Sequence, residues 1–159
     1  MNVRFLTVGG LKEGFYREAI EEYRKRLSRY VKLEIIEVRD EKTPDKSSPL
    51  EEEKIKEKEA ERLLSHIKER ELVIALAIEG KKLSSTGFAQ ALSSWERRSR
   101  GNLVFLIGGS LGLGRKVLDR ADEMLSFSDM TFPHQLMRVI LAEQLYRAYR
   151  IKHGEPYHK

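Results

Sequence analysis

The chain has 159 residues, of which 40% are hydrophobic and 35% are charged, and its formal net charge is +5 at pH 7. This length predicts a single domain spanning 1–159. The positive charge is compatible with an anionic partner, most of all a nucleic acid. A lysine-rich protein that has no such partner would explain the charge equally well. The absence of cysteine excludes a disulfide framework, a thiolate nucleophile and a zinc site with cysteine ligands. No apolar run approaches membrane-spanning length and the first residues begin a strand rather than a signal peptide, so we expect a cytoplasmic protein.

The N-terminal part of the chain predicts a strand, a helix and a second strand. Residues 3–8 form a short apolar strand, and the apolar residues in 31–35 alternate with charged ones, which is the period of a strand. Between them, helical spacing over 12–28 predicts one stripe that faces the core, formed by Phe15, Ala19, Ile20, Tyr23 and Leu27. Lysines and arginines crowd the rest of this helix, which favours a solvated face over an RNA-binding one.

A polar segment and a highly charged helix follow. Residues 39–49 contain two prolines and two serines and predict a loop, for which disorder is favoured over functional mobility. The next residues predict the start of a helix. Ser48 is a suitable N-cap, Pro49 occupies the first helical position, and Glu51 completes a capping box with Ser48. We expect the helix to continue to about Arg70 and to cover the protein without chemistry of its own.

The second half of the chain continues the alternation. Apolar runs over 72–78 and 102–107 predict strands that are covered on both faces. Between them we expect a turn at 79–81 and a helix capped by Ser84 or Ser85 that ends near Arg98. The last expected elements are a helix over 115–121, a strand over 124–127 and a helix opened by 131–134. This order predicts an α/β fold with a mostly parallel sheet and helices on both faces.

A glycine-rich turn follows the strand over 102–107, with four glycines in the seven residues of 108–114. It is not a Walker A loop, because Arg115 and Lys116 follow Gly114 where that motif has lysine and serine or threonine. It is not a Rossmann fingerprint either, because Val117 stands where the final glycine belongs. Glycines at the carboxyl end of a parallel strand allow a ligand to approach the backbone, so we favour a ligand site over a plain tight turn.

The last helix is apolar on all sides, which predicts burial on all sides. We favour an arrangement in which one face of the helix packs on the sheet and another face packs on a second subunit, because a C-terminal helix is usually peripheral in its own subunit. The alternative is that it is a central core helix of a monomer. His134 and Arg138 are four residues apart and share one face.

These motifs, taken together, resemble the RlmH family of SPOUT-class methyltransferases. The resemblance spans the whole chain and rests on 106–109 with Gly112, on 130–134 with Arg138, and on the terminal 156–158. It implies a homodimer whose C-terminal half is threaded into a trefoil knot. It also implies transfer of a methyl group from S-adenosylmethionine to N3 of a pseudouridine in the large-subunit (23S) ribosomal RNA of assembled ribosomes.

The resemblance also implies which residues hold the cofactor. The contacts carry over to Leu76, Gly108, Phe127, Ser128, Asp129, Met130, Thr131 and Phe132. The N3–H group is a weak acid that must lose its proton as the new bond forms, so a general base or a stabilising cation would help. The available candidates are His134, Arg138, Tyr157 and His158.

Interpretations without any catalytic role stay open for these residues. His134 can simply cap its helix, and the tail after Gly154 can be a frayed terminus. We expect no metal site, because the four histidines show no ligand spacing. Two other functions are compatible with the sequence: an RNA-binding protein that has lost catalysis, and a nucleotide hydrolase that uses the glycine turn. Against the hydrolase, the chain lacks the lysine-serine pair and acidic metal ligands.

Overall fold

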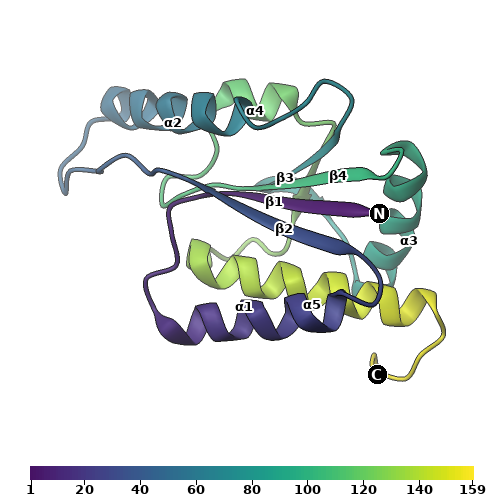
Figure 1. The fold of residues 1–159 in the computed structure, drawn as a ribbon. Helices are drawn as coiled ribbons and strands as arrows, with labels where there is room; N and C mark the ends of the chain where they lie inside the picture. Colours follow the sequence, from purple (N-terminus) through teal and green to yellow (C-terminus); the bar gives the residue numbers. More distant parts are fainter.

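The computed structural model describes all residues 1–159 and shows a five-stranded parallel sheet between two layers of helices (Figure 1). In chain order the elements are β1 (Asn2–Val8), α1 (Gly14–Leu27), β2 (Lys32–Val38), α2 (Pro49–Leu64), β3 (Leu72–Lys82), α3 (Ser85–Arg98), β4 (Asn102–Ile107), α4 (Arg115–Arg120), β5 (Glu123–Ser126) and α5 (His134–Lys152). The strands lie in the order β2-β1-β4-β3-β5, and every pair is parallel. The α/β fold with a parallel sheet is therefore confirmed.

The strands β1 and β4 form the centre of the sheet. They pair over six residues, and Phe5 lies directly opposite Phe105 with the two rings edge to face and their centroids 5.9 Å apart. All residues from Leu103 to Ile107 are buried, because helices cover both faces of this strand. The continuous apolar run of β4 is thus explained by its central position.

The helices divide between the two faces. The larger core lies between the sheet and α1, α3 and α5, and the smaller core lies between the sheet and α2 and α4 (Figure 1). Within its layer α5 packs against α1 on one side and α3 on the other. It is therefore a central helix of its own subunit, which corrects the assumption that it is peripheral and accounts for much of its apolar surface without a second copy.

Several element boundaries and one core residue differ from expectation. The Ser48 hydroxyl caps α2 as predicted, at 3.2 Å from the Glu51 amide, but the helix ends at Leu64 instead of Arg70. Arg4 on β1 donates to the carbonyl of His66, which ties down the segment that follows the helix. Phe15 is 63% exposed rather than in the core, because α1 begins at Gly14 and its first turn lies beyond the sheet-facing contacts.

The strand β3 continues through the turn expected at 79–81 and ends at Lys82. Its register against β5 shifts, so that Leu76 and Lys81 both pair with Leu125 and the residues between them leave the sheet as a short detour. A Cβ on Gly80 would lie 2.6 Å from the Leu125 nitrogen, so only glycine fits where the detour returns to β5. This detour forms one wall of the cavity described next.

Candidate functional site

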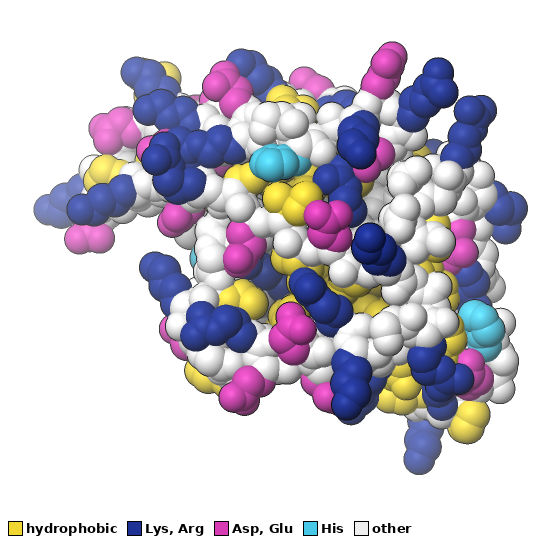
Figure 2. Space-filling view, in the orientation of Figure 1, with side chains coloured by type: hydrophobic (Ala, Val, Ile, Leu, Met, Phe, Trp, Pro, Cys, Tyr) yellow, Lys and Arg dark blue, Asp and Glu magenta, His cyan; other side chains and the backbone are white.

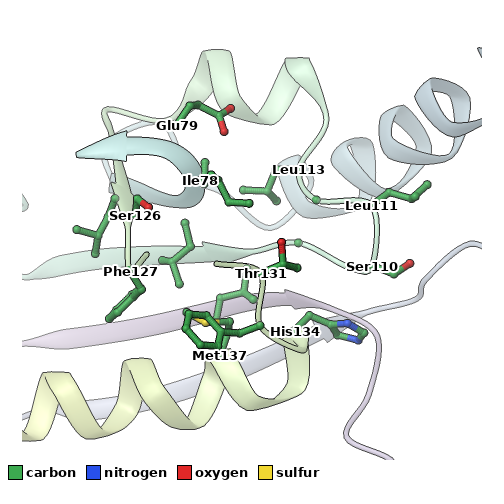
Figure 3. A pocket seen from close by; sticks show the side chains of 18 of the residues that line it. Ile78, Glu79, Ser110, Leu111, Leu113, Ser126, Phe127, Thr131, His134 and Met137 are labelled. Carbon is green, nitrogen blue, oxygen red and sulfur yellow. The ribbon is translucent and has the colours of Figure 1, made fainter. Parts of the chain in front are cut away.

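A cavity of about 790 Å³ lies at the carboxyl end of the sheet, within the range of about 300–1,000 Å³ typical of sites for small molecules and cofactors. Three segments line it: residues 76–79 of the β3 detour, 107–113 of the glycine turn, and 125–134 between β5 and α5 without Asp129. Three helical side chains complete the lining: Lys56 of α2, Leu118 of α4 and Met137 of α5. Figure 3 shows His134 and Met137 on one side of the cavity, with Ile78 and Leu113 on the opposite side. Parallel α/β sheets bind ligands at this edge.

The glycine turn closes on itself tightly. The Gly112 amide donates to the Gly109 carbonyl at 3.1 Å, and Gly112 has a φ of +87°, a conformation that favours glycine. A Cβ on Gly108 would lie 2.6 Å from the Gly112 carbonyl carbon and 3.0 Å from the Leu113 nitrogen. Because both neighbours are backbone atoms, they cannot move aside as a flexible side chain could. The absence of a side chain at Gly108 is therefore what lets the turn close.

The segment between β5 and α5 forms the opposite wall. The Ser126 hydroxyl donates to the Ser128 carbonyl at 3.1 Å, and the Met130 amide donates to the Ser128 hydroxyl at 3.0 Å, so the segment holds its own shape. Only five large hydrophobic side chains of the protein are exposed, and two of them, Met130 at 71% and Ile78 at 52%, line this cavity. Open apolar side chains around a concave site favour a ligand with an apolar or aromatic face.

His134 is the one histidine that lines the cavity. It is half-buried, and burial is the main cause that lowers the pKa of its imidazole from the ordinary value of 6.5; the charge of Arg138 and, more weakly, that of Lys12 lower it further. Asp40 acts in the opposite direction. A neutral imidazole at pH 7 can accept a proton, so His134 has the properties of a general base.

Arg138 faces away from the cavity lining, although it shares a helix face with His134. Its guanidinium group is fully buried, forms an ion pair with Glu37 at 2.8 Å, and donates to the carbonyls of Val8 and Gly9 at 3.0 and 2.6 Å. Glu37 also accepts from the Leu11 amide at 3.1 Å. Arg138 thus joins the start of α5 to the carboxyl ends of β1 and β2, on the side of the molecule where His134 lies.

The replacement Arg138→Met should destabilise the fold strongly. Methionine fills similar space but leaves the two carbonyls without their donor and Glu37 without its partner, which should cost about 2–4 kcal/mol in the free energy of unfolding. Arg97→Met is the matched control, because Arg97 is exposed on α3 and makes no ion pair. Urea unfolding at one protein concentration measures both. Equal stability of the two variants would contradict a structural role for Arg138.

The C-terminal tail packs against its own α5 and is not frayed. The Tyr157 hydroxyl donates to Glu143 at 3.1 Å, and the Tyr157 ring meets Tyr146 edge to face with the centroids 4.9 Å apart. The His158 Nδ1 atom lies 3.1 Å from a guanidinium nitrogen of Arg147. Neither Tyr157 nor His158 lines the cavity of its own chain. Arg147 is thirteen residues from His134 along α5, a rise of about 20 Å.

The structure therefore brings together part of the expected site. The predicted cofactor contacts Leu76, Gly108 and 127–132 all line the cavity except Asp129, which is exposed and pairs with Lys82 at 2.5 Å. Of the four catalytic candidates, only His134 lies there.

Sequence reasoning missed other parts of the lining. Ile78 and Glu79 belong to the β3 detour, and Lys56 belongs to the helix that was expected to carry no chemistry. The apolar run up to Ile78 could have indicated the first, but nothing in the pattern of α2 distinguishes Lys56 from its other lysines.

No group of three or more acidic or histidine side chains is arranged to hold a metal ion. No helix is both long and apolar enough to cross a bilayer.

Comparison with known proteins gives a consistent result. The family model described as "Predicted SPOUT methyltransferase" matches residues 1–158. Three similar curated proteins are each named "Ribosomal RNA large subunit methyltransferase H". They come from Clostridioides difficile, Clostridium novyi and Streptococcus gordonii and are 56%, 55% and 53% identical to this chain. Each alignment covers 159 residues, the full length of both chains.

Proposed function

The chain belongs to the SPOUT methyltransferase family, and its full-length relatives are named as methyltransferases of large-subunit ribosomal RNA. We therefore propose that this protein methylates large-subunit ribosomal RNA. Specifically, we propose transfer of a methyl group from S-adenosylmethionine to N3 of a pseudouridine in 23S ribosomal RNA, within assembled ribosomes in the cytoplasm. The observation that carries this proposal is the full-length family match of a chain whose main cavity combines a closed glycine turn with open apolar side chains.

The cavity suits S-adenosylmethionine in size and chemistry. Ile78 and Met130 provide apolar contacts for an adenine ring, and the backbone of Gly108 and of 127–132 provides N–H and C=O groups for its polar edge. When bound, this cofactor supplies a methyl group on a positively charged sulfur. The protein's contribution to such an in-line displacement is chiefly to position the two reacting atoms.

We assign the general base to His134. It is the only histidine in the cavity lining, and burial keeps its imidazole neutral at physiological pH, ready to take the N3 proton. Arg138 then acts as a positioning residue, because its buried guanidinium group holds the strand ends beside the first turn of α5. Tyr157 is not a base near neutrality, because burial, aided by its bond to Glu143, raises the pKa of its hydroxyl to about 12.

We further propose a homodimer in which the tail completes the partner's cavity. Figure 1 shows the C-terminus on the side of the sheet where β1 begins, away from the carboxyl ends of the strands. Proton transfer and hydrogen bonding need contacts of about 3 Å, so a tail held some 20 Å along α5 cannot serve its own cavity. Two half-buried apolar side chains of α5 that do not pack against the larger core, Leu136 and Ile140, provide a surface for a second copy.

The remaining parts of the proposal concern threading and RNA contact. We propose that the C-terminal half forms the trefoil knot of the family. The family match supports this proposal, and the glycine turn, the β3 detour and the segment before α5 all line one cavity. Figure 2 shows lysine and arginine side chains spread among acidic ones over the visible face, without a single basic patch. RNA contact through such a surface depends on many separate phosphate contacts and weakens as salt rises.

The test of the proposed function is to map the modified nucleotide. Ribosomes from cells that lack this protein are incubated with the purified protein and S-adenosylmethionine, and primer extension locates any new stop in 23S RNA. We expect one stop at a pseudouridine, with N3-methylpseudouridine identified by mass spectrometry. A His134→Ala variant with intact cofactor binding by calorimetry is the control. Methylation of another nucleotide, or none with the wild type, would refute the proposal.

The pH dependence of the reaction should reflect His134. Because the pKa of its imidazole is lowered, the neutral base persists to lower pH than in a free histidine, and protonation removes it as the pH falls further. We therefore expect kcat/KM to fall on the acid side with a midpoint below 6.5, the ordinary value. Initial rates between pH 5 and pH 8, at constant ionic strength, measure it. A midpoint above 6.5 would argue against His134 as the base.

A further inference from the structure

We propose that His158 acts as a hydrogen-bond donor through its Nε2–H group, and that Arg147 is the positioning residue that fixes this tautomer. The inference rests on the proposed methyl transfer and gives the tail a defined chemical role in it. His158 donates to a carbonyl oxygen of the target base, while the proton of N3 goes to His134.

The tautomer follows from the chemistry of the two partners. The Nδ1 atom of His158 lies 3.1 Å from a guanidinium nitrogen of Arg147, and arginine has only donors and stays charged. Nδ1 must therefore accept, which places the single proton of the neutral ring on Nε2. A positively charged ring would carry protons on both nitrogens and could not make this contact. Nε2 has no partner within the chain and is free to donate outward.

The guanidinium group of Arg147 is itself held in place. It donates to Glu143 at 2.5 Å, and its central carbon lies 4.9 Å from the centroid of the Tyr157 ring. Glu143 also accepts from the Tyr157 hydroxyl, so one carboxylate fixes the arginine and the neighbouring tail residue together. Arg147 thus presents its second nitrogen to His158 in one orientation.

The backbone of the tail is fixed as well. Arg150 donates to the Pro156 carbonyl at 3.0 Å, and Glu155 pairs with Arg150 at 2.8 Å while accepting from the Tyr30 hydroxyl at 2.9 Å. The left-handed residue Gly154, with a φ of +63°, turns the chain back toward α5. The donor is therefore preorganised before any substrate arrives, which is what electrostatic stabilisation in an enzyme site requires.

The reaction needs such a donor. The N3–H group of pseudouridine lies between two carbonyl groups, so loss of its proton spreads negative charge onto both carbonyl oxygens. In the proposed step, the N3–H bond gives its proton to His134 of one subunit and a new N3–CH₃ bond forms. The carbon–sulfur bond breaks, and sulfur keeps the electron pair as a neutral thioether. An Nε2–H donor from the partner's tail stabilises the developing charge on one carbonyl oxygen.

Nuclear magnetic resonance tests the tautomer without relying on activity. The full-length protein, with ¹⁵N in its histidines, is measured at pH 7.5, and His158 is assigned by its absence in His158→Gln. In the wild type we expect the signals of a ring that is protonated at Nε2. In Arg147→Ala we expect a mixture of the two tautomers. Arg147→Lys should restore part of the wild-type pattern, because a lysine side chain also acts only as a donor. An Nδ1–H ring or a doubly protonated ring in the wild type would overturn the assignment.

Kinetics test the chemical role. A glutamine amide places its N–H near the position of Nε2, whereas an asparagine amide mimics Nδ1, so the pair separates donation from simple size. We expect His158→Gln to lose about tenfold in kcat, and His158→Asn and His158→Ala to lose on the order of 100-fold, with cofactor affinity unchanged by calorimetry. Equal losses in all three variants would refute the donor role. Failure of the wild type to methylate RNA would instead refute the proposed function and leave the tautomer measurement intact.

Discussion

Replacing Gly108 with alanine should weaken S-adenosylmethionine binding by on the order of 100-fold, because the added methyl group cannot fit in the closed turn. Its Cβ would lie 2.6 Å from the carbonyl carbon of Gly112 and 2.9 Å from the Gly112 oxygen, both backbone atoms. The turn has to open to relieve this contact, which displaces the backbone groups proposed to hold the cofactor. The effect therefore comes from the protein backbone before any clash with the ligand itself.

Gly14→Ala is the matched control for this prediction. Gly14 is the first residue of α1, and no heavy atom lies within 4 Å of the Cβ it would acquire. Alanine suits a helix better than glycine, so this variant should be as stable as the wild type or slightly more. Calorimetric titration with S-adenosylmethionine, with the fold checked by circular dichroism, compares the two. If folded Gly108→Ala binds as tightly as Gly14→Ala, the cofactor does not depend on the glycine turn.

The parts of this molecule that follow from local sequence were predictable. The apolar run of β4, the Ser48 cap and the glycine turn each depend on a few adjacent residues, and the structure has them where expected. The exposure of Phe15 was not predictable, because helical spacing gives the buried stripe of α1 but not where the helix stops touching the sheet.

The chemistry of the site depended more on distant partners. His134 and Arg138 share a helix face in the sequence, yet one lines the cavity and the other is buried against Glu37, which lies 101 residues away. Nothing in the local pattern of α5 shows where that carboxylate is. The detour in β3 is similar, because the shift that removes Ala77–Gly80 from the sheet arises only when β5 pairs with the strand.

Two inactive variants should restore activity when their subunits exchange, if the active site is shared across a dimer. One variant is truncated after Gly154 and lacks Tyr157 and His158; the other keeps the tail but carries His134→Ala. In a mixed dimer, the intact cavity of the truncated subunit meets the intact tail of the other, and one complete site forms. Equal mixing with free exchange puts about half of the dimers in this form, so about a quarter of the wild-type activity should return.

The geometry of the tail is the reason to expect this result. Its contacts with Glu143 and Arg147 hold it far along α5 from the cavity of its own chain, and breaking them to reach that cavity would sacrifice the preorganised donor. Exchange is confirmed by native mass spectrometry before the assay, and Gly108→Ala replaces His134→Ala in a second mixture to show that restoration does not depend on one variant. If mixed dimers form in both cases and methylation stays absent, each subunit completes its own site. The tail must then leave α5 to act, and the positioning role of Arg147 fails with the shared site.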